Sequence, residues 1–145
     1  MKTLVLFDTN FGNTKLVAET ITQALGKDAR VVSVSDFTIQ ELEGVDCIVV
    51  GSPIIGWRPS EKMGKFLANL RSGQLNGCKA AAFDTRIKAW YSGDASKKIA
   101  NKLKRAGAKI IVPPQAFFVK GKEGPLVDGE IEKAAKWAAL IKQNR

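Results

Sequence analysis

A stretch rich in hydroxyl and amide side chains near the start of the chain decides the fold, and it reads Thr9-Asn10-Phe11-Gly12-Asn13-Thr14. An apolar run at residues 4–7 precedes it and is typical of a short buried strand. An amphipathic segment that begins at Leu16 follows it and repeats apolar residues at helical spacing. In the order strand, loop, helix, the N–H groups at the helix start point at one spot, where an anion satisfies them. The stretch therefore predicts a phosphate site.

Two other kinds of nucleotide-binding loop do not fit this stretch. No Gly-Lys-Thr or Gly-Lys-Ser occurs in the chain, which excludes a Walker loop. Gly12 is the only glycine of the stretch, which excludes the dinucleotide-binding fingerprint. One alternative needs no ligand at all: an ordinary helix start whose N-cap residue is Asn10 or Asn13.

The stretch resembles the phosphate loop of flavodoxins. That family's pattern of Thr or Ser, any residue, Thr or an aromatic, Gly, Asn and Thr is matched position by position. The resemblance implies that FMN is the cofactor, because the sequence shows no second segment that could hold the adenosine of FAD. It also implies that the phosphate of FMN is held by Thr9, Asn10, Phe11, Gly12, Asn13 and Thr14.

The composition indicates one globular domain over residues 1–145. The chain is 45% hydrophobic, and no apolar run approaches the roughly 20 residues that cross a bilayer. The first residues lead directly into a strand instead of a signal sequence, so we expect a cytoplasmic protein. Cys47 and Cys78 lie in apolar segments without metal-ligand spacing and are interpreted as core residues. The chain has no histidine, so any catalysis is expected to come from a cofactor.

Strand and helix patterns alternate along the chain. Further strands are expected at 31–34, 45–50, 79–83 and 109–112, and helices from Pro59-Ser60 and over 95–106 and 129–143. A short helical turn is expected where Thr38 and Glu41 form a capping box. Pro113-Pro114 interrupts the last strand, and 115–119 is expected to resume extended structure at a sheet edge. The pattern predicts an α/β flavodoxin-like three-layer sandwich with a five-stranded parallel sheet of order 2-1-3-4-5, whose ligand site lies where strands 1 and 3 separate.

The loops after strands 3 and 4 are expected beside the phosphate site. The first runs over 51–59 and contains Trp57, which either stacks on a planar ring or covers the end of the core. The second runs over 84–94 and contains Trp90 and Tyr91.

The resemblance gives these loops specific roles. Flavodoxins hold the flavin ring between side chains of these two loops, and Ser-Gly-Asp-Ala at 92–95 is similar to a Ser-Gly-Glu-Ala that follows the stacking residue in related domains. This implies stacking by Tyr91, with Trp90 as the rival. Thr85 and Arg86 would offer backbone groups to the pyrimidine edge, and Gly56 either turns its carbonyl toward the reduced flavin or merely makes the turn. The residues expected in the first loop are Ser52, Pro53, Ile54, Ile55, Gly56 and Trp57.

The charge of the chain departs from the acidic family pattern. The net charge is +9, and the excess lies in the second half, where residues 73–145 hold fifteen basic and six acidic side chains. On the helix expected at 95–106, Lys97, Lys98, Lys104 and Arg105 lie opposite the apolar face. This face is either simply solvated or a docking surface for an acidic protein or another polyanion. Nucleic acid is the weaker candidate because no recognised binding motif accompanies the charge.

Basic side chains also occur in the loops expected to face the flavin. Arg58, Arg86 and Lys88 stand there against Asp84 and Asp94. We therefore expect the reduced, negatively charged flavin to form more easily here than in acidic flavodoxins.

The leading hypothesis is an FMN-binding protein that carries electrons between redox partners and needs no catalytic residue. The alternative is an NAD(P)H-dependent quinone or flavin reductase of the same fold. A phosphoacceptor domain is disfavoured, because Gly51-Ser52 and Val112-Pro113 stand where it needs an aspartate and a lysine. A flavin-free relative of the same fold is a further alternative. The glycine-rich segment 120–126 could serve either to cover the flavin or to contact a partner.

Overall fold

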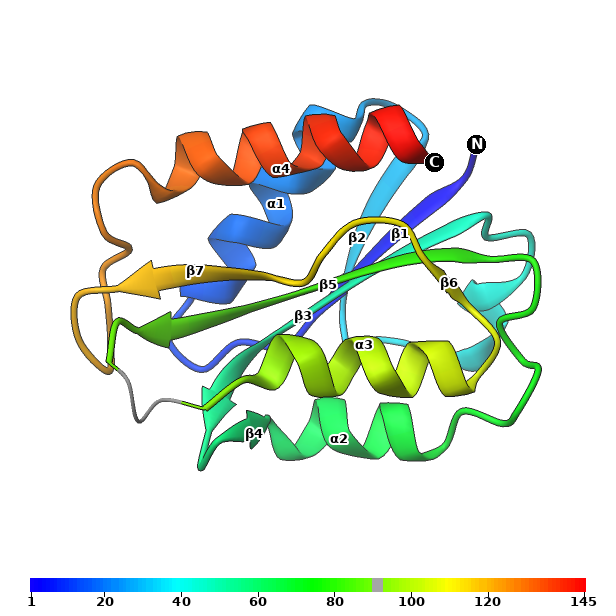
Figure 1. Cartoon of the computed structure of the whole chain (residues 1–145), viewed down its shortest axis with the longest axis horizontal. Coiled ribbons are helices and arrows are strands. Elements are labelled where there is room, and N and C mark those ends of the chain that lie inside the picture. The colour runs from blue at the N-terminus through cyan, green and yellow to red at the C-terminus, as the bar shows by residue number, and fades with distance from the viewer. Residues whose placement is uncertain (90–92) are drawn as a thin grey trace.

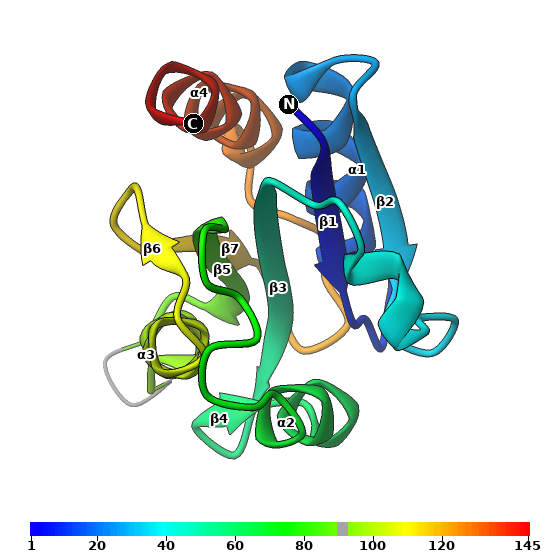
Figure 2. The same ribbon diagram turned by 90° about the vertical axis from the view of Figure 1, so that its right-hand side faces the viewer.

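A parallel sheet between two pairs of helices forms the protein. The computed structural model describes residues 1–89 and 93–145. Figure 1 shows α1 and α4 on one face of the sheet and α2 and α3 on the other, and Figure 2 shows the same layers after a turn of 90°. The strands are β1 (Thr3–Phe7), β2 (Ala29–Ser33), β3 (Cys47–Ile55), β4 (Arg58–Pro59), β5 (Lys79–Ile87), β6 (Lys109–Ile110) and β7 (Gln115–Val119). The helices are α1 (Asn13–Leu25), α2 (Glu61–Ala68), α3 (Ala95–Arg105) and α4 (Glu130–Asn144), with a 3-10 turn at Ile39–Leu42.

The strand order confirms the predicted topology. The sheet runs β2-β1-β3-β5-β6, and all of these neighbours pair in parallel. Both β6 and β7 pair with β5, so together they fill the fifth position of the expected order 2-1-3-4-5. The interruption between them covers residues 111–114 and includes the predicted break at Pro113-Pro114, where proline has no N–H for the ladder. The strand before it is shorter than the expected 109–112. The short β4 adds an antiparallel hairpin to the end of β3.

Strands β3 and β5 are longer than predicted, which corrects the loop boundaries. Ser52, Pro53, Ile54 and Ile55 belong to β3, and Thr85 and Arg86 belong to β5. The parallel ladder continues through the pairs Ser52–Asp84 and Pro53–Thr85, and β7 supports the end of β5. The last residues of both strands are therefore held by hydrogen bonds to neighbouring strands instead of lying in loops.

Two apolar clusters hold the helices to the sheet. One lies under α2 and α3 and includes Cys78, and the other lies under α1 and α4 and includes Cys47. Both cysteines are buried, which confirms their interpretation as core residues. Burial raises the pKa of each thiol to about 11, so both are protonated at neutral pH. Gly51 is required by this packing, because a Cβ there would lie 2.0 Å from the ring of Phe83.

Two expectations about local structure have different outcomes. The capping box of Thr38 and Glu41 is confirmed at the 3-10 turn. The expected start of α1 is wrong, because the helix begins at Asn13 and Leu16 is 47% exposed. The buried face of α1 instead comprises Thr14, Val17, Ala18, Ile21 and Leu25.

Within the described ranges, no helix has the length and apolarity to cross a membrane.

Candidate functional site

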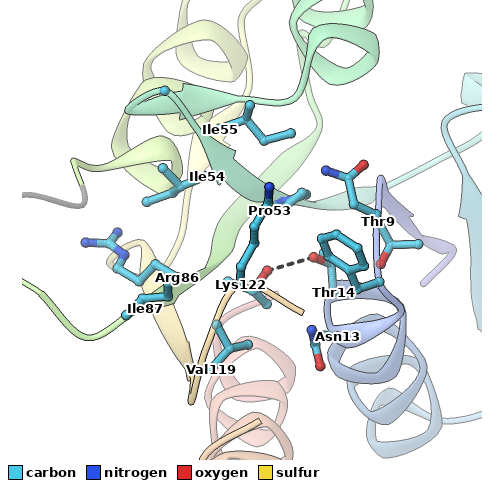
Figure 3. A pocket seen from close by; sticks show the side chains of 14 residues that line it. Thr9, Asn13, Thr14, Pro53, Ile54, Ile55, Arg86, Ile87, Val119 and Lys122 are labelled. Atoms are coloured by element: carbon cyan, nitrogen blue, oxygen red, sulfur yellow. Dashed lines mark hydrogen bonds between the residues drawn. The ribbon is translucent and has the colours of Figure 1, made fainter. Parts of the chain in front are cut away.

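A pocket of about 530 Å³ opens at the carboxyl ends of the parallel strands, beside the start of α1. This volume lies within the usual range of small-molecule and cofactor sites, roughly 300–1,000 Å³. Figure 3 shows side chains from β3, β5, the α1 start and the segment after β7 around it. The lining residues are Thr9, Asn10, Phe11, Asn13, Thr14, Pro53, Ile54, Ile55, Gly56, Thr85, Arg86, Ile87, Val119 and Lys122.

One end of the pocket is the start of α1. Gly12 occupies the N-cap position with φ of 90°, and no side chain caps the helix. The predicted alternative, a cap by Asn10 or Asn13, is therefore wrong. The Gly12 N–H donates to Thr9 Oγ1 at 2.9 Å, and the Asn13 side-chain amide donates to the Glu123 carbonyl at 3.2 Å. The first N–H groups of the helix are left for an anion, which the helix dipole also favours.

Two threonines join α1 to β5 beside the pocket. The hydroxyls of Thr14 and Thr85 lie 2.7 Å apart and form a hydrogen bond in which either oxygen can donate. Figure 3 marks this bond by its dashed line. Both residues are almost fully buried, so the bond satisfies two polar groups that water does not reach. It fixes the start of α1 against β5.

Apolar side chains form much of the remaining wall. They are Pro53, Ile54 and Ile55 from β3, Ile87 from β5, and Val119 from β7. Ile55 and Ile87 are more than 40% exposed, so part of this apolar wall faces solvent. A pocket with an anion site at one end and apolar walls along the rest suits a planar ring that carries a phosphate tail.

Arg86 forms the charged part of this wall, and two carboxylates match its charge. It donates to Asp84 at 2.8 and 2.6 Å and to Asp94 Oδ1 at 3.1 Å. Burial raises the pKa of Asp84, whereas Arg86 and the Ser96 N–H oppose that rise. The hydrogen bond to Asp84 raises the pKa of Arg86. Asp94 is partly buried, but bonds from the Lys97 N–H and the Ser96 hydroxyl and the charge of Arg86 hold its pKa below the usual value.

Three predicted residues lie outside the pocket lining. Ser52 is fully buried, where its hydroxyl donates to the Pro53 carbonyl and accepts from the Ser60 N–H, both at 2.9 Å. It shapes the β3–β4 hairpin. Gly12 adjoins the lining through its neighbours Phe11 and Asn13. Trp57 is 60% exposed and is the third.

Trp57 lies in the turn that joins β3 to β4. Gly56 and Trp57 both have positive φ, 57° and 64°, as tight hairpin turns require. A Cβ on Gly93 would lie 2.7 Å from Trp57, so the two loops meet closely at this point. Trp90 and Tyr91 lie outside the described residues. The stacking roles of Trp57, Trp90 and Tyr91 therefore stay predictions.

Three lining residues were not among the predicted site residues: Ile87, Val119 and Lys122. Lys122 belongs to segment 120–126, and Figure 3 shows its side chain pointing into the pocket. An antiparallel bridge between Val119 and Leu126 closes this segment, and the Asn13 amide holds its Glu123 carbonyl. The contact joins residues 110 positions apart, and no local pattern reveals it. Two roles were left open for segment 120–126, to cover the flavin or to contact a partner. Its position beside the pocket supports the role of covering the flavin.

Comparisons with known proteins agree with this geometry. The family model described as flavodoxin matches residues 5–137. The chain belongs to the flavodoxin family. A flavodoxin from Aquifex aeolicus (strain VF5) is 30% identical over 92 residues, covering 58% of this chain and 49% of that protein. The chain thus spans about half the length of this curated relative.

Solved flavodoxin structures share the whole architecture. A flavodoxin from the domain Archaea has 26% identity and a TM-score of 0.82, covering 99% of this chain and 97% of its own. Oxidised flavodoxin 1 from Bacillus cereus has 21% identity and a TM-score of 0.85, covering 100% of this chain and 99% of its own. The second likeness supports the flavodoxin-like fold alone.

Flavodoxins bind FMN, and FMN is the cofactor of this chain. The residues present fit it. The uncapped start of α1 has free N–H donors for the phosphate, and the hydroxyl of Thr9 lies beside them. The cavity and its apolar walls suit the ring.

Proposed function

We propose that this flavodoxin-family protein carries electrons between redox partner proteins on bound FMN. The observation that supports this most is the pocket itself, which joins an uncapped helix start to apolar walls. Among the described lining residues, only Arg86 and Lys122 are ionisable, and both types of side chain are cations at neutral pH. FMN supplies the redox chemistry, so neither of these side chains needs to act as an acid or base. The test below separates a carrier from a reductase.

Each group of residues has a task in this proposal. Residues Thr9 to Thr14 hold the phosphate, and the ends of β3 and β5 flank the ring. Ser52 acts indirectly by fixing the hairpin turn that presents Gly56 and Trp57. Trp57 stacks on one face of the ring, and Tyr91 or Trp90 stacks on the other. Gly56 can reorient its peptide on reduction because glycine tolerates a wide range of φ.

Purification and cofactor exchange test the proposal. The protein is expected to be yellow and to release a cofactor with the mass of FMN. The deflavinated protein is expected to bind FMN at least tenfold more tightly than riboflavin, which lacks the phosphate. A colourless protein that takes up neither would defeat the proposal. Stopped-flow mixing with NADPH separates the carrier from the reductase, because rapid direct bleaching of the flavin would favour the enzyme.

The partner proposed for this carrier is an acidic protein that docks near Lys97, Lys98, Lys104 and Arg105. All four side chains are exposed on α3, opposite the buried Ile99 and Leu103. A surface of one charge sign speeds and orients the encounter with an oppositely charged protein. We further propose a cytoplasmic location. The assignment of residues 1–145 to one domain stays a prediction.

A further inference from the structure

Helices α2 and α3 lie side by side on one face of the sheet, as both Figure 1 and Figure 2 show. A groove of about 270 Å³ lies between them. It is lined by Pro59, Gly64, Leu67, Lys98, Asn101, Lys102 and Arg105. Three of these residues are cations from one face of α3, and no carboxylate of the described residues lines the groove. The groove is therefore strongly basic.

The basic surface of α3 has two sides that face different hollows. Lys98, Lys102 and Arg105 line the groove toward α2. Lys97 and Lys104 line a separate hollow toward β6. Lys97 lies 3.8 Å from Asp94, whereas in the described part of the chain the other four cations of α3 make no ion pair. Three of these four, Lys98, Lys102 and Arg105, line the groove toward α2, and Lys104 lines the hollow toward β6. More of the unmatched charge therefore lies on the α2 side.

Gly64 lies in the floor of this groove. It is in the interior of α2, where glycine destabilises a helix relative to alanine. A Cβ at this position would meet no atom within 4 Å, and the φ of Gly64 is outside the left-handed region. The packing and the backbone therefore do not require a glycine. What the missing side chain provides is close access to the backbone of α2 from outside.

The groove continues toward the cofactor pocket. Pro59 and Gly64 also line a neighbouring hollow that reaches Arg58 and Ile55. Ile55 in turn lines the cofactor pocket. At the other rim, the Lys98 ammonium donates to the Trp57 carbonyl at 2.9 Å, which ties α3 to the hairpin turn. A molecule seated in the groove therefore lies against the same hairpin that borders the cofactor.

We propose that the groove between α2 and α3 is the docking site for an acidic segment of a redox partner protein. The cations of α3 bind its carboxylates, and Gly64 lets its backbone approach α2. The proposal rests on the carrier function, because the site's use is to bring a second redox centre beside Ile55. It also narrows the basic surface of α3 proposed above to the side that faces α2, with Lys102 and Arg105 as the main contacts. Lys97 and Lys104 then act on the partner only through the long-range field and do not touch it.

Charge reversals on the two sides of α3 test which side docks. The probe is a fluorescein-labelled, glutamate-rich helical peptide, and the readout is fluorescence anisotropy with the FMN-loaded protein at two salt concentrations. The double variant Lys102→Glu/Arg105→Glu is expected to weaken binding at least tenfold and to flatten the salt dependence. The matched double variant Lys97→Glu/Lys104→Glu carries the same change in net charge and is expected to cost no more than about threefold. Equal losses of peptide affinity in the two double variants would overturn the proposal. They would show that the peptide responds to the net charge of the protein and does not bind at one side of α3.

A steric variant tests the groove without changing its charge. Gly64→Gln is expected to weaken the peptide at least fivefold with an unchanged salt dependence, while Gly64→Ala keeps most of the binding. Both substitutions favour the helix, so folding and FMN absorbance should persist. Unchanged binding by Gly64→Gln would overturn the docking site. So would complete displacement of the peptide by millimolar inorganic phosphate, which would indicate a small-anion site. A colourless protein would instead defeat the carrier function itself.

Discussion

At the scale of single residues, Lys122 sets the charge of the cofactor pocket. Arg86, the other described cation of the lining, is matched by Asp84 and Asp94. Lys122 has no ion-pair partner in the described part of the chain. Of the three cations expected to favour reduced flavin, Arg58 and Lys88 do not line the pocket, and Arg86 is paired with two carboxylates. That the reduced flavin forms easily stays a prediction, and Lys122 is the lining cation on which to test it.

Replacing Lys122 should make the flavin harder to reduce. Lys122→Gln is expected to weaken binding of the reduced, negatively charged FMN by about fivefold more than binding of oxidised FMN, as for a solvent-exposed ion pair. The midpoint potential then falls by about 40 mV for one electron, since a tenfold change corresponds to about 59 mV. Potentiometric titration measures this shift. The control is Lys120→Gln, in the same segment but outside the pocket lining. Equal shifts in both variants would contradict a specific role.

The position of the loop over residues 9–14 could be predicted from the sequence, but that of Lys122 could not. The loop is a local pattern of six residues, and its strand and helix lie directly beside it. Lys122 reaches the same pocket only because segment 120–126 is fastened to Asn13 through Glu123, across 110 residues. A lysine in a glycine-rich loop has no periodicity or spacing that points to a partner so distant.

The hydroxyl pair of Thr14 and Thr85 predicts non-additive effects on stability. Either single change to valine leaves one buried hydroxyl without its partner and should lower the free energy of unfolding by about 1–3 kcal/mol. The double variant removes both polar groups and should lose less than the sum of the single losses. Urea unfolding of all four proteins, without added FMN, completes the cycle. Additive losses would show that the two hydroxyls do not depend on each other.

At the scale of elements, the ends of β3 and β5 were predicted as loops and are strands. The prediction ended the strands where the apolar runs stop, near residues 50 and 83. The pairs that follow, Ser52–Asp84 and Pro53–Thr85, continue the ladder because β5 lies between β3 and β7 and pairs with both. A buried ladder at the end of a sheet can hold polar residues, so apolar patterning alone underestimates strand length. This is also why the pocket walls are strands.

The start of α3 predicts a pH-dependent contribution to stability. Asp94 is its N-cap and accepts from the Lys97 N–H at 3.0 Å. Its pKa is lowered in the folded protein, so the folded state favours the ionised form. The resulting stability is present above the ordinary aspartate pKa of 3.8 and is lost as pH falls through the lowered native value. Asp84 acts with the opposite sign, because burial raises its pKa.

Two substitutions at Asp94 separate the cap from the charge. Asp94→Ala removes both and is expected to lower the free energy of unfolding by about 1 kcal/mol at neutral pH. Asp94→Asn keeps a capping side chain and should lose less. The gap between wild type and Asp94→Asn should shrink as the pH falls from about 7 to about 3. Urea unfolding across this range measures it. A gap that widens with acidification would show that the pKa of Asp94 is not lowered.

At the scale of the whole molecule, the charge of the chain is arranged unequally about the fold. The excess of cations lies in the second half of the sequence, which supplies α3, β7, α4 and segment 120–126. Of these elements, β7 and segment 120–126 border the cofactor pocket through Val119 and Lys122. Helix α3 borders the proposed docking groove. The same positive field therefore acts on the flavin and on an approaching partner, and it favours negative charge at both places.

This field predicts the sign of the salt dependence of the flavin potential. In a protein of net charge +9, the positive field stabilises the reduced, negatively charged flavin, and added salt screens that field. The midpoint potential should therefore fall as NaCl rises, by on the order of 20 mV between about 0.02 and 0.5 M. An acidic flavodoxin should shift in the opposite direction, because salt screens a repulsion. The Lys102→Glu/Arg105→Glu variant, with its lower net charge, should show a smaller fall. A potential that rises with salt in the wild type would show that local groups outweigh the overall charge.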